Sequence, residues 1–152
     1  KLVTFIAKLP IEHVVITGGE PFEQNIESFI QNLAKHKKTV QIETSGTDDF
    51  SNYYLPTNSW ITLSPKLGKS IKGNKEFIHE NIDKINEIKY PIGKKQDVEN
   101  LFRFINRYCI INKDIWLQPL SQNKTATQLC IDTAKQYNFK VSIQTHKFID
   151  IL

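Results

Sequence analysis

Short apolar segments recur along the chain, and each is followed by polar or turn-forming residues. Their starts lie about 20 to 28 residues apart, which is the spacing of βα units in a parallel sheet. Segments that stay apolar on both faces are typical of strands covered by helices. The pattern predicts six strands: His13–Thr17, Val40–Thr44, Trp60–Ser64, Glu87–Pro91, Ile115–Pro119 and Val141–Thr145.

Three intervals between these strands carry amphipathic helical patterns, with apolar residues recurring at i, i+4, i+7 and i+8. They predict helices over Phe22–His36, Gln96–Cys109 and Thr125–Tyr137. Gly93 and Asn123 precede the second and third helices and are natural turn residues.

Six parallel strands with right-handed crossovers indicate an α/β fold, an open or partial (β/α) barrel, in one domain spanning residues 1–152. In such folds, function gathers at the C-terminal ends of the strands. Every predicted strand ends in polar residues, so we expect these ends to line one site. The segments are Thr17–Glu20, Glu43–Gly46, Ser64–Lys66, Lys89, Gln118–Ser121 and Gln144–Lys147.

The composition is that of a soluble globular protein, with 39% hydrophobic and 24% charged residues among 152. No apolar run of 18 or more residues predicts a membrane span, and the first residues lack the pattern of a signal peptide. Two cysteines are too few for a disulfide framework, which favours a cytoplasmic protein. The sequence begins with Lys1 and contains no Met, which suggests a piece of a longer translation product.

The net charge is +4, and basic residues are spread along the chain with acidic residues between them. This pattern favours a lysine-rich composition, or mild attraction for anionic small molecules, over a nucleic-acid surface. We therefore expect no direct contact with nucleic acid.

TGGEP, from Thr17 to Pro21, follows a predicted strand and precedes a predicted helix. Its two glycines let the backbone approach a ligand closely, Glu20 can accept a hydrogen bond from a cationic amine, and Pro21 suits a helix start. An ordinary strand-to-helix turn with an acidic first turn explains the same residues.

The ends of the next two strands offer hydroxyls and charge. ETSGT supplies Glu43, Thr44 and Ser45, groups that suit a ribose or a carboxylate, although the motif taken alone favours a plain turn that closes the strand. SPK places Ser64 and Lys66 at a strand end, where the ammonium would attract a carboxylate; a solvated basic loop is the plainer alternative.

Later strand ends are also polar. LQPLSQ offers Gln118 and Ser121 to an adenine or ribose edge, with turn chemistry as the alternative. Glu87 and Lys89 share one face of their strand, either as an ion pair or as part of the site. QTHK places His146 after the last strand, where an imidazole can bind a heterocycle or a carboxylate, although a lone histidine is usually structural.

In this order, TGGEP, ETSGT, SPK, LQPLS and QTHK resemble the motifs of radical S-adenosylmethionine (SAM) enzymes, and VSIQTHKFIDIL closely resembles the terminal segment of 7-carboxy-7-deazaguanine synthases. The resemblance implies a substrate site at Thr17, His146 and Leu152, although that family often ends in proline. It implies SAM contacts at Gly18, Gly19, Glu20, Glu43, Ser45, Ser64, Pro65, Lys66, Gln118, Pro119, Leu120 and Ser121.

The implied reaction is the ring contraction of 6-carboxy-5,6,7,8-tetrahydropterin to 7-carboxy-7-deazaguanine, with loss of ammonia, in the queuosine pathway of tRNA modification. The resemblance further implies a 4Fe-4S cluster, SAM and Mg²⁺ as cofactors, a homodimer, and an electron donor such as flavodoxin. Two alternatives stay open: another radical SAM enzyme of the activase or peptide-modifying type, and a SAM- or nucleotide-binding module without a cluster.

A 4Fe-4S cluster of this kind is held by three thiolates from a short cysteine motif, which the sequence lacks. Cys109 and Cys130 both fall on predicted helix stripes, so we interpret them as buried packing thiols. We expect the cluster ligands, and a threonine for Mg²⁺, to lie upstream of Lys1. This polypeptide alone is therefore expected not to cleave SAM.

Overall fold

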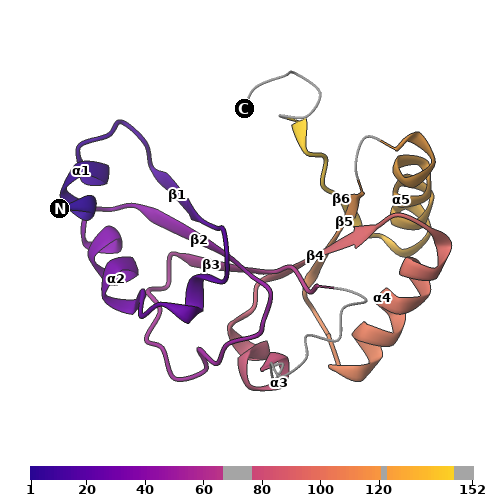
Figure 1. The fold of residues 1–152 in the computed structure, drawn as a ribbon, viewed down its shortest axis with the longest axis horizontal. Coiled ribbons are helices and arrows are strands. Elements are labelled where there is room, and N and C mark those ends of the chain that lie inside the picture. Colours follow the sequence, from indigo (N-terminus) through magenta and orange to yellow (C-terminus); the bar gives the residue numbers. More distant parts are fainter. Residues whose placement is uncertain (67–76, 121–122, 146–152) are drawn as a thin grey trace. The chain divides into compact units, whose positions relative to one another are not determined.

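The protein has an α/β fold in a computed structural model that describes residues 1–66, 77–120 and 123–145 (Figure 1). The chain divides into two compact units, Lys1–Asn86 and Glu87–Leu152. Each unit contains three strands, and every pair of neighbouring strands within a unit is parallel. Six strands with helices between them confirm the predicted fold class.

The first unit places its strands in the order β1-β2-β3. The register pairs Val15 with Gln41, and Gln41 with Trp60. Its elements are α1 (Leu2–Ala7), β1 (His13–Ile16), the 3-10 helix η1 (Pro21–Glu23), α2 (Glu27–Lys35), β2 (Thr39–Thr44), β3 (Ser59–Leu63), α3 (Ile78–Asn81) and the 3-10 helix η2 (Ile82–Lys84).

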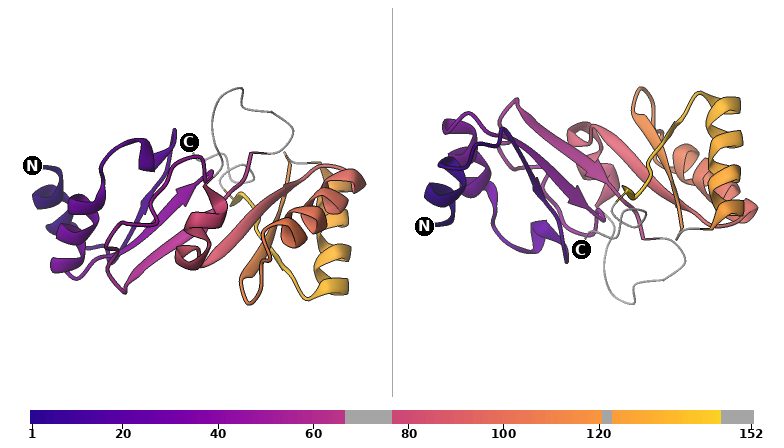
Figure 2. Two further views of the ribbon diagram at one scale, coloured as in Figure 1. Left: turned by 90° about the horizontal axis from the view of Figure 1, so that it is seen from below. Right: turned by 90° about the horizontal axis from the view of Figure 1, so that it is seen from above.

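The core of this unit lies between α2 and one face of the sheet. Ile30 and Leu33 on α2 are fully buried, as are Ile42 and Leu63 on the strands. Helix α2 packs against β2, and α1 packs against α2, which the views of Figure 2 also show. The alternation of buried and less buried residues along β2 follows from this one-sided cover.

The opposite face of β1-β2-β3 carries a row of polar side chains. His13 Nδ1 lies 2.8 Å from Thr39 Oγ1, and His13 Nε2 lies 3.2 Å from Gln41 Oε1. Gln41 Nε2 in turn donates to Thr62 Oγ1 at 2.8 Å. This polar row (His13, Thr39, Gln41 and Thr62) links all three strands through side chains as well as through the backbone.

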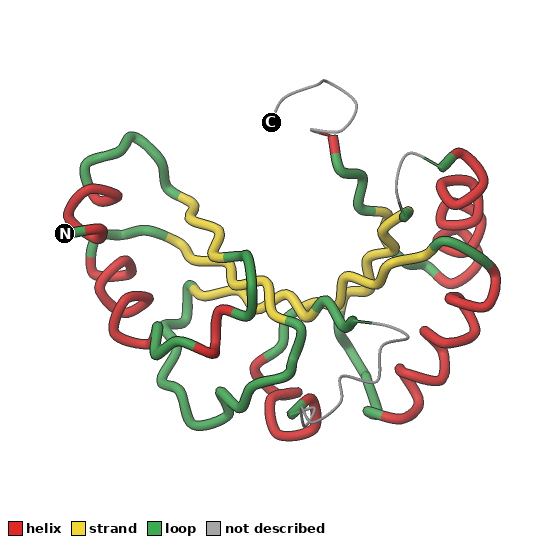
Figure 3. Tube along the Cα trace, in the orientation of Figure 1, coloured by secondary structure: helices red, strands yellow, loops and turns green. Residues whose placement is uncertain are grey.

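The second unit places its strands in the order β4-β5-β6. Helices α4 and α5 pack on the same side of β4 and β5 (Figure 3), over a core that includes Ile88, Leu101, Leu117 and Cys130. Its elements are β4 (Glu87–Ile92), α4 (Lys95–Arg107), β5 (Asp114–Pro119), α5 (Lys124–Tyr137) and β6 (Lys140–Val141).

Local hydrogen bonds explain where the two long helices begin. Asp97 Oδ2 accepts from the backbone N–H groups of Gly93 and Lys94 at 2.8 and 3.0 Å, which closes the first turn of α4. Asn123 is the N-cap of α5 and accepts from the N–H groups of Thr125 and Ala126. The sequence had predicted Gly93 and Asn123 as the turn residues at these two positions.

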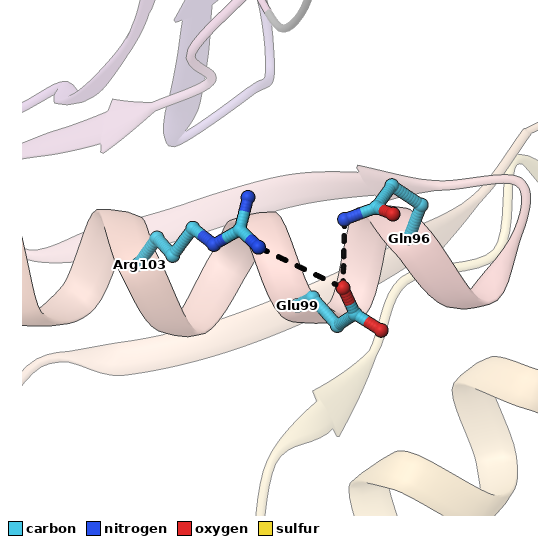
Figure 4. A network of polar contacts seen from close by, with 3 residues as sticks. All are labelled: Gln96, Glu99 and Arg103. Atoms are coloured by element: carbon cyan, nitrogen blue, oxygen red, sulfur yellow. Dashed lines mark hydrogen bonds and ion pairs between the residues drawn. The ribbon is translucent and has the colours of Figure 1, made fainter.

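The outer surface of α4 carries a small polar network (Figure 4). Glu99 Oε2 accepts from Gln96 Nε2 at 2.7 Å and lies 3.9 Å from Arg103 Nη2. These side chains sit three and four residues apart, where they face each other on a helix. The arginine and glutamate side chains are 74% and 60% exposed, so the pair contributes little to stability.

The structure corrects the predicted boundaries at two places. The helix predicted over Phe22–His36 is split into η1 and α2, because the backbone is extended at Gln24 and Phe22 instead stacks on Phe50 at 4.0 Å between ring centroids. The strand predicted over Val141–Thr145 is only Lys140–Val141. Beyond it, Ser142 N still donates to Leu117 O on β5, and Thr145 N then folds back to donate to Ile143 O.

The interpretation of both cysteines as buried was half wrong. Cys130 is fully buried on α5, as expected. Cys109 is exposed, because α4 ends at Arg107 and Cys109 lies beyond it with a left-handed φ of 48°. No helix among the described residues has the length and apolar character needed to cross a membrane.

Candidate functional site

The turn after β1 exposes its backbone. Gly18 and Gly19 have φ values of +89° and +56°, a region that side chains disfavour. A Cβ atom placed on either glycine would meet nothing within 4 Å. Thr17, Gly18 and Gly19 are all exposed. The glycines are therefore required by the backbone conformation and not by packing, and the peptide groups remain open to a ligand.

Glu20, the next residue, is only 6% exposed, and the chain itself satisfies its carboxylate. Oε1 accepts from Thr44 Oγ1 at 2.6 Å and from Phe22 N at 3.4 Å. Oε2 accepts from Ser45 Oγ at 2.6 Å and from Ser45 N at 2.8 Å. These contacts join the turn after β1 to the end of β2.

The turn after β2 is tightly packed. Gly46 has φ +80°, and a Cβ atom there would lie 2.8 Å from Leu63 Cδ1 and 3.0 Å from Ile78 Cγ1. Gly46 N donates to Thr44 Oγ1 at 3.1 Å. Only glycine satisfies both the dihedral angle and the space at this position.

The end of β3 lies beside this turn, because Ser64 N donates to Thr44 O at 2.7 Å. Ser64 is half-buried, Pro65 is buried and Lys66 is exposed. Glu43 is half-buried and points to the opposite face from Thr44 by strand alternation.

The first unit therefore brings together the predicted residues from three strand ends, with Glu20 and Ser45 in direct contact. Gln118, Pro119 and Leu120 lie at the end of β5 in the second unit, where Leu120 N donates to Ile92 O at 2.8 Å. The predicted Ser121, His146 and Leu152 lie outside the described residues.

The sequence offered the hydroxyl of Thr44 either to a ligand or to a turn that closes the strand, and it gave Gly46 a role only in that turn. In the structure Thr44 is 2% exposed and its hydroxyl bonds Glu20 and Gly46 N. The glycine in ETSGT was the available signal for a left-handed turn, but its crowding depends on Leu63 and Ile78 from distant segments.

The described residues fit the predicted cofactors unequally. The exposed peptide groups of the Gly18-Gly19 turn suit the methionyl part of SAM. The hydroxyl of Ser45, a group of the kind that a ribose needs, already donates to Glu20 Oε2 at 2.6 Å. Across residues 1–66, 77–120 and 123–145, no three His, Cys, Asp or Glu side chains gather as a metal site. Burial raises the pKa of Cys130 to about 11, which disfavours a thiolate ligand there.

No protein-family model matches the chain. The relatives described below nevertheless share one name. The 7-carboxy-7-deazaguanine synthase of Buchnera aphidicola (subsp. Schizaphis graminum) is 40% identical over 153 residues, covering 99% of this chain and 65% of that protein. The synthase of the same name from Bacteroides thetaiotaomicron is 31% identical, covering 99% of this chain and 71% of that protein.

A solved structure agrees with these relatives. The crystal structure of QueE from Escherichia coli superposes with a TM-score of 0.82 at 35% identity, covering 94% of this chain and 62% of that one. The chain thus spans less than two thirds of the length of this structure and of the Buchnera protein.

Proposed function

Since the chain belongs to the 7-carboxy-7-deazaguanine synthase family, we propose that it takes part in the SAM-dependent ring contraction of 6-carboxy-5,6,7,8-tetrahydropterin to 7-carboxy-7-deazaguanine. The observation that supports this most directly is the contact between the open glycine turn after β1 and the hydroxyl-bearing end of β2. Both segments carry residues that the sequence resemblance assigns to SAM binding.

In this proposal the exposed peptide groups of Gly18 and Gly19 bind the methionyl amine. Glu43 and Ser45 face the ribose side. Lys66, exposed at the end of β3, attracts a carboxylate from SAM or from the substrate. Ser64, Pro65, Gln118, Pro119, Leu120 and Ser121 complete the SAM contacts.

The pterin site is proposed at Thr17, His146 and Leu152. Thr17 is exposed immediately before the glycine turn, so a pterin in contact with it lies close to the proposed SAM site. An imidazole at position 146 can donate to or accept from a heterocycle or a carboxylate.

Bound together, a 4Fe-4S cluster and SAM supply the carbon radical that starts such a reaction. The two cysteines of this sequence cannot provide three thiolates, and they lie on and after different helices. We therefore derive no step through the cluster, and propose that its ligands and those of Mg²⁺ come from residues beyond these 152. A homodimer and a flavodoxin-type electron donor belong to the same proposal.

Two measurements test it. Calorimetry with SAM on the 152-residue chain should detect binding. Fusing a three-cysteine segment from a curated relative ahead of Lys1, followed by anaerobic reconstitution, should give 7-carboxy-7-deazaguanine, identified by mass spectrometry. Absence of SAM binding to both proteins contradicts the proposal. SAM binding to both without product formation favours a binding module without a cluster.

The division of the site is tested in the reconstituted fusion. His146→Ala should weaken binding of the carboxypterin while SAM affinity stays within about twofold, the scatter expected for a residue outside a binding site. His36→Ala is the matched control, because His36 is exposed after α2. Loss of SAM binding in His146→Ala, with the control unchanged, contradicts this division.

A further inference from the structure

We infer that Glu20 is a positioning residue, whose carboxylate fixes the glycine turn to the end of β2 instead of receiving the amine of SAM. The inference rests on the proposed function for its ligand, but the contacts that carry it lie within the chain. It replaces the direct role that the sequence suggested for this carboxylate.

The acceptor capacity of Glu20 is already used. An ionised carboxylate offers about four lone-pair sites, and four donors of the chain occupy them. Both hydroxyl contacts are 2.6 Å long, the range of charge-assisted hydrogen bonds. An arriving ammonium would have to displace one of these donors from a side chain that is only 6% exposed.

The same contacts set the geometry of both turns. Thr44 Oγ1 donates to Glu20 and accepts from Gly46 N, so the carboxylate is connected to the packed turn. At the Gly18-Gly19 turn, no atom packs within 4 Å of where a Cβ would lie. Beyond the pairing of β1 with β2, which reaches Ile16 and Ile42, its position relative to Ser45 therefore depends on Glu20. We call Glu20, Thr44 and Ser45 the Glu20 cluster.

Glu20→Gln tests the inference without changing the size of the side chain. The amide NH₂ replaces an acceptor with a donor, so it opposes either the N–H of Ser45 or the N–H of Phe22. The amide exchange of whichever N–H it opposes, followed by NMR without ligand, should accelerate by about tenfold. Affinity for SAM, measured by calorimetry, should fall by about tenfold as well.

The ligand series separates positioning from direct contact. 5′-Methylthioadenosine lacks the methionyl amine but keeps the ribose that Ser45 faces in the proposed site, so a displaced Ser45 should weaken its binding to Glu20→Gln as well as that of SAM. If Glu20 instead binds the amine, the variant loses affinity for SAM alone, and the exchange of Ser45 and Phe22 is unchanged. That result would overturn the inference.

Thr44 provides a matched pair. Thr44→Val keeps the shape and removes the hydroxyl, and it should lower the affinity for both ligands; Thr44→Ser keeps the hydroxyl and should bind both as the parent does. A folded Thr44→Val with unchanged affinities contradicts the inference. If Thr44→Val does not fold, the amide exchange of Ser45 and Phe22 in folded Glu20→Gln decides instead.

The two proposals fail in different ways. If the parent chain binds no SAM, the proposed function fails, while the exchange of Ser45 and Phe22 in Glu20→Gln still reports on the contacts of the carboxylate. If SAM binds but neither exchange rate changes in Glu20→Gln, the positioning role fails alone.

Discussion

The turns after β1 and β2 use the same backbone conformation for different reasons. Gly18, Gly19 and Gly46 all have positive φ values, yet the first two are surrounded by open space and the third is crowded by Leu63 and Ile78. A left-handed turn by itself therefore does not mark a ligand site. The space beside it distinguishes a turn that presents backbone from a turn that packs.

The largest effect is expected where the turn is packed. Gly46→Ala combines a left-handed strain of about 1–2 kcal/mol with overpacking of about 1–3 kcal/mol, because its Cβ would lie 2.8 Å from Leu63 Cδ1. We expect the free energy of unfolding to fall by about 3 kcal/mol, measured by urea denaturation. A loss below about 1 kcal/mol would show that Leu63 and Ile78 can move aside at little energetic cost. The distinction between the packed turn and the open turn would then be wrong.

The segment after the packed turn depends on one buried amide. Asn81 is fully buried; its Oδ1 accepts from Phe50 N at 3.0 Å and its Nδ2 donates to Asp48 O at 2.8 Å. Asn81→Ala leaves both backbone groups unpaired, so we expect a loss of about 2 kcal/mol in urea unfolding.

Asn32→Ala is the control for this variant. Its side chain bonds Ser28 O on the exposed face of α2, and its loss should change stability by about 0.5 kcal/mol or less. Equal losses in the two variants would show that burial of Asn81 has no energetic consequence.

A substitution in the open turn should lower the affinity for SAM more than it lowers the free energy of unfolding. Gly18→Ala adds a Cβ that meets no atom of the chain, so only the strain of about 1 kcal/mol applies to unfolding. Affinity for SAM should fall by more than about tenfold, because the added methyl group and the altered turn lie where the ligand approaches. Calorimetry and urea unfolding of one preparation measure both. A pure stability effect would contradict the assignment of this turn to SAM.

The two thiols also differ in their surroundings, since one is buried and one is exposed. Replacing the exposed thiol should change stability little. Burial raises the pKa of Cys130 to about 11, so its reactive thiolate is scarce at pH 8, while Cys109 is exposed. One thiol per chain should react quickly with a disulfide reagent in the native protein, and the second only on unfolding. Cys109→Ser should remove the fast phase with a stability change of about 0.5 kcal/mol or less.

The periodicity of the sequence was sufficient to predict all six strands and the two helices of the second unit, because each of these elements buries apolar residues in the core of its own unit. The residues at the helix starts could also be predicted, because Asn123 accepts a hydrogen bond from Thr125 N in the turn immediately after it. The break at Gln24 was not predictable, because Phe22 belongs to the core through Phe50, a residue far along the chain.

The sequence predicts a candidate site at the strand ends, but it does not predict the contacts within that site. Strand-end chemistry singled out Gly18, Glu20 and Ser45 as candidates, and the sequence could not show that two of them bond each other. Short polar residues offer the same donors to a ligand and to a neighbouring strand. Only the three-dimensional arrangement decides which partner they meet.

The polar row across β1, β2 and β3 has a consequence for how this protein can vary. His13, Gln41 and Thr62 are hydrogen-bonded in series, so replacing His13 or Thr62 removes a partner of the half-buried Gln41 side chain. Across homologous chains these positions should covary, with an apolar residue at 13 accompanied by an apolar residue at 41. An alignment in which the three positions drift independently would show that natural selection does not act on the row as a unit.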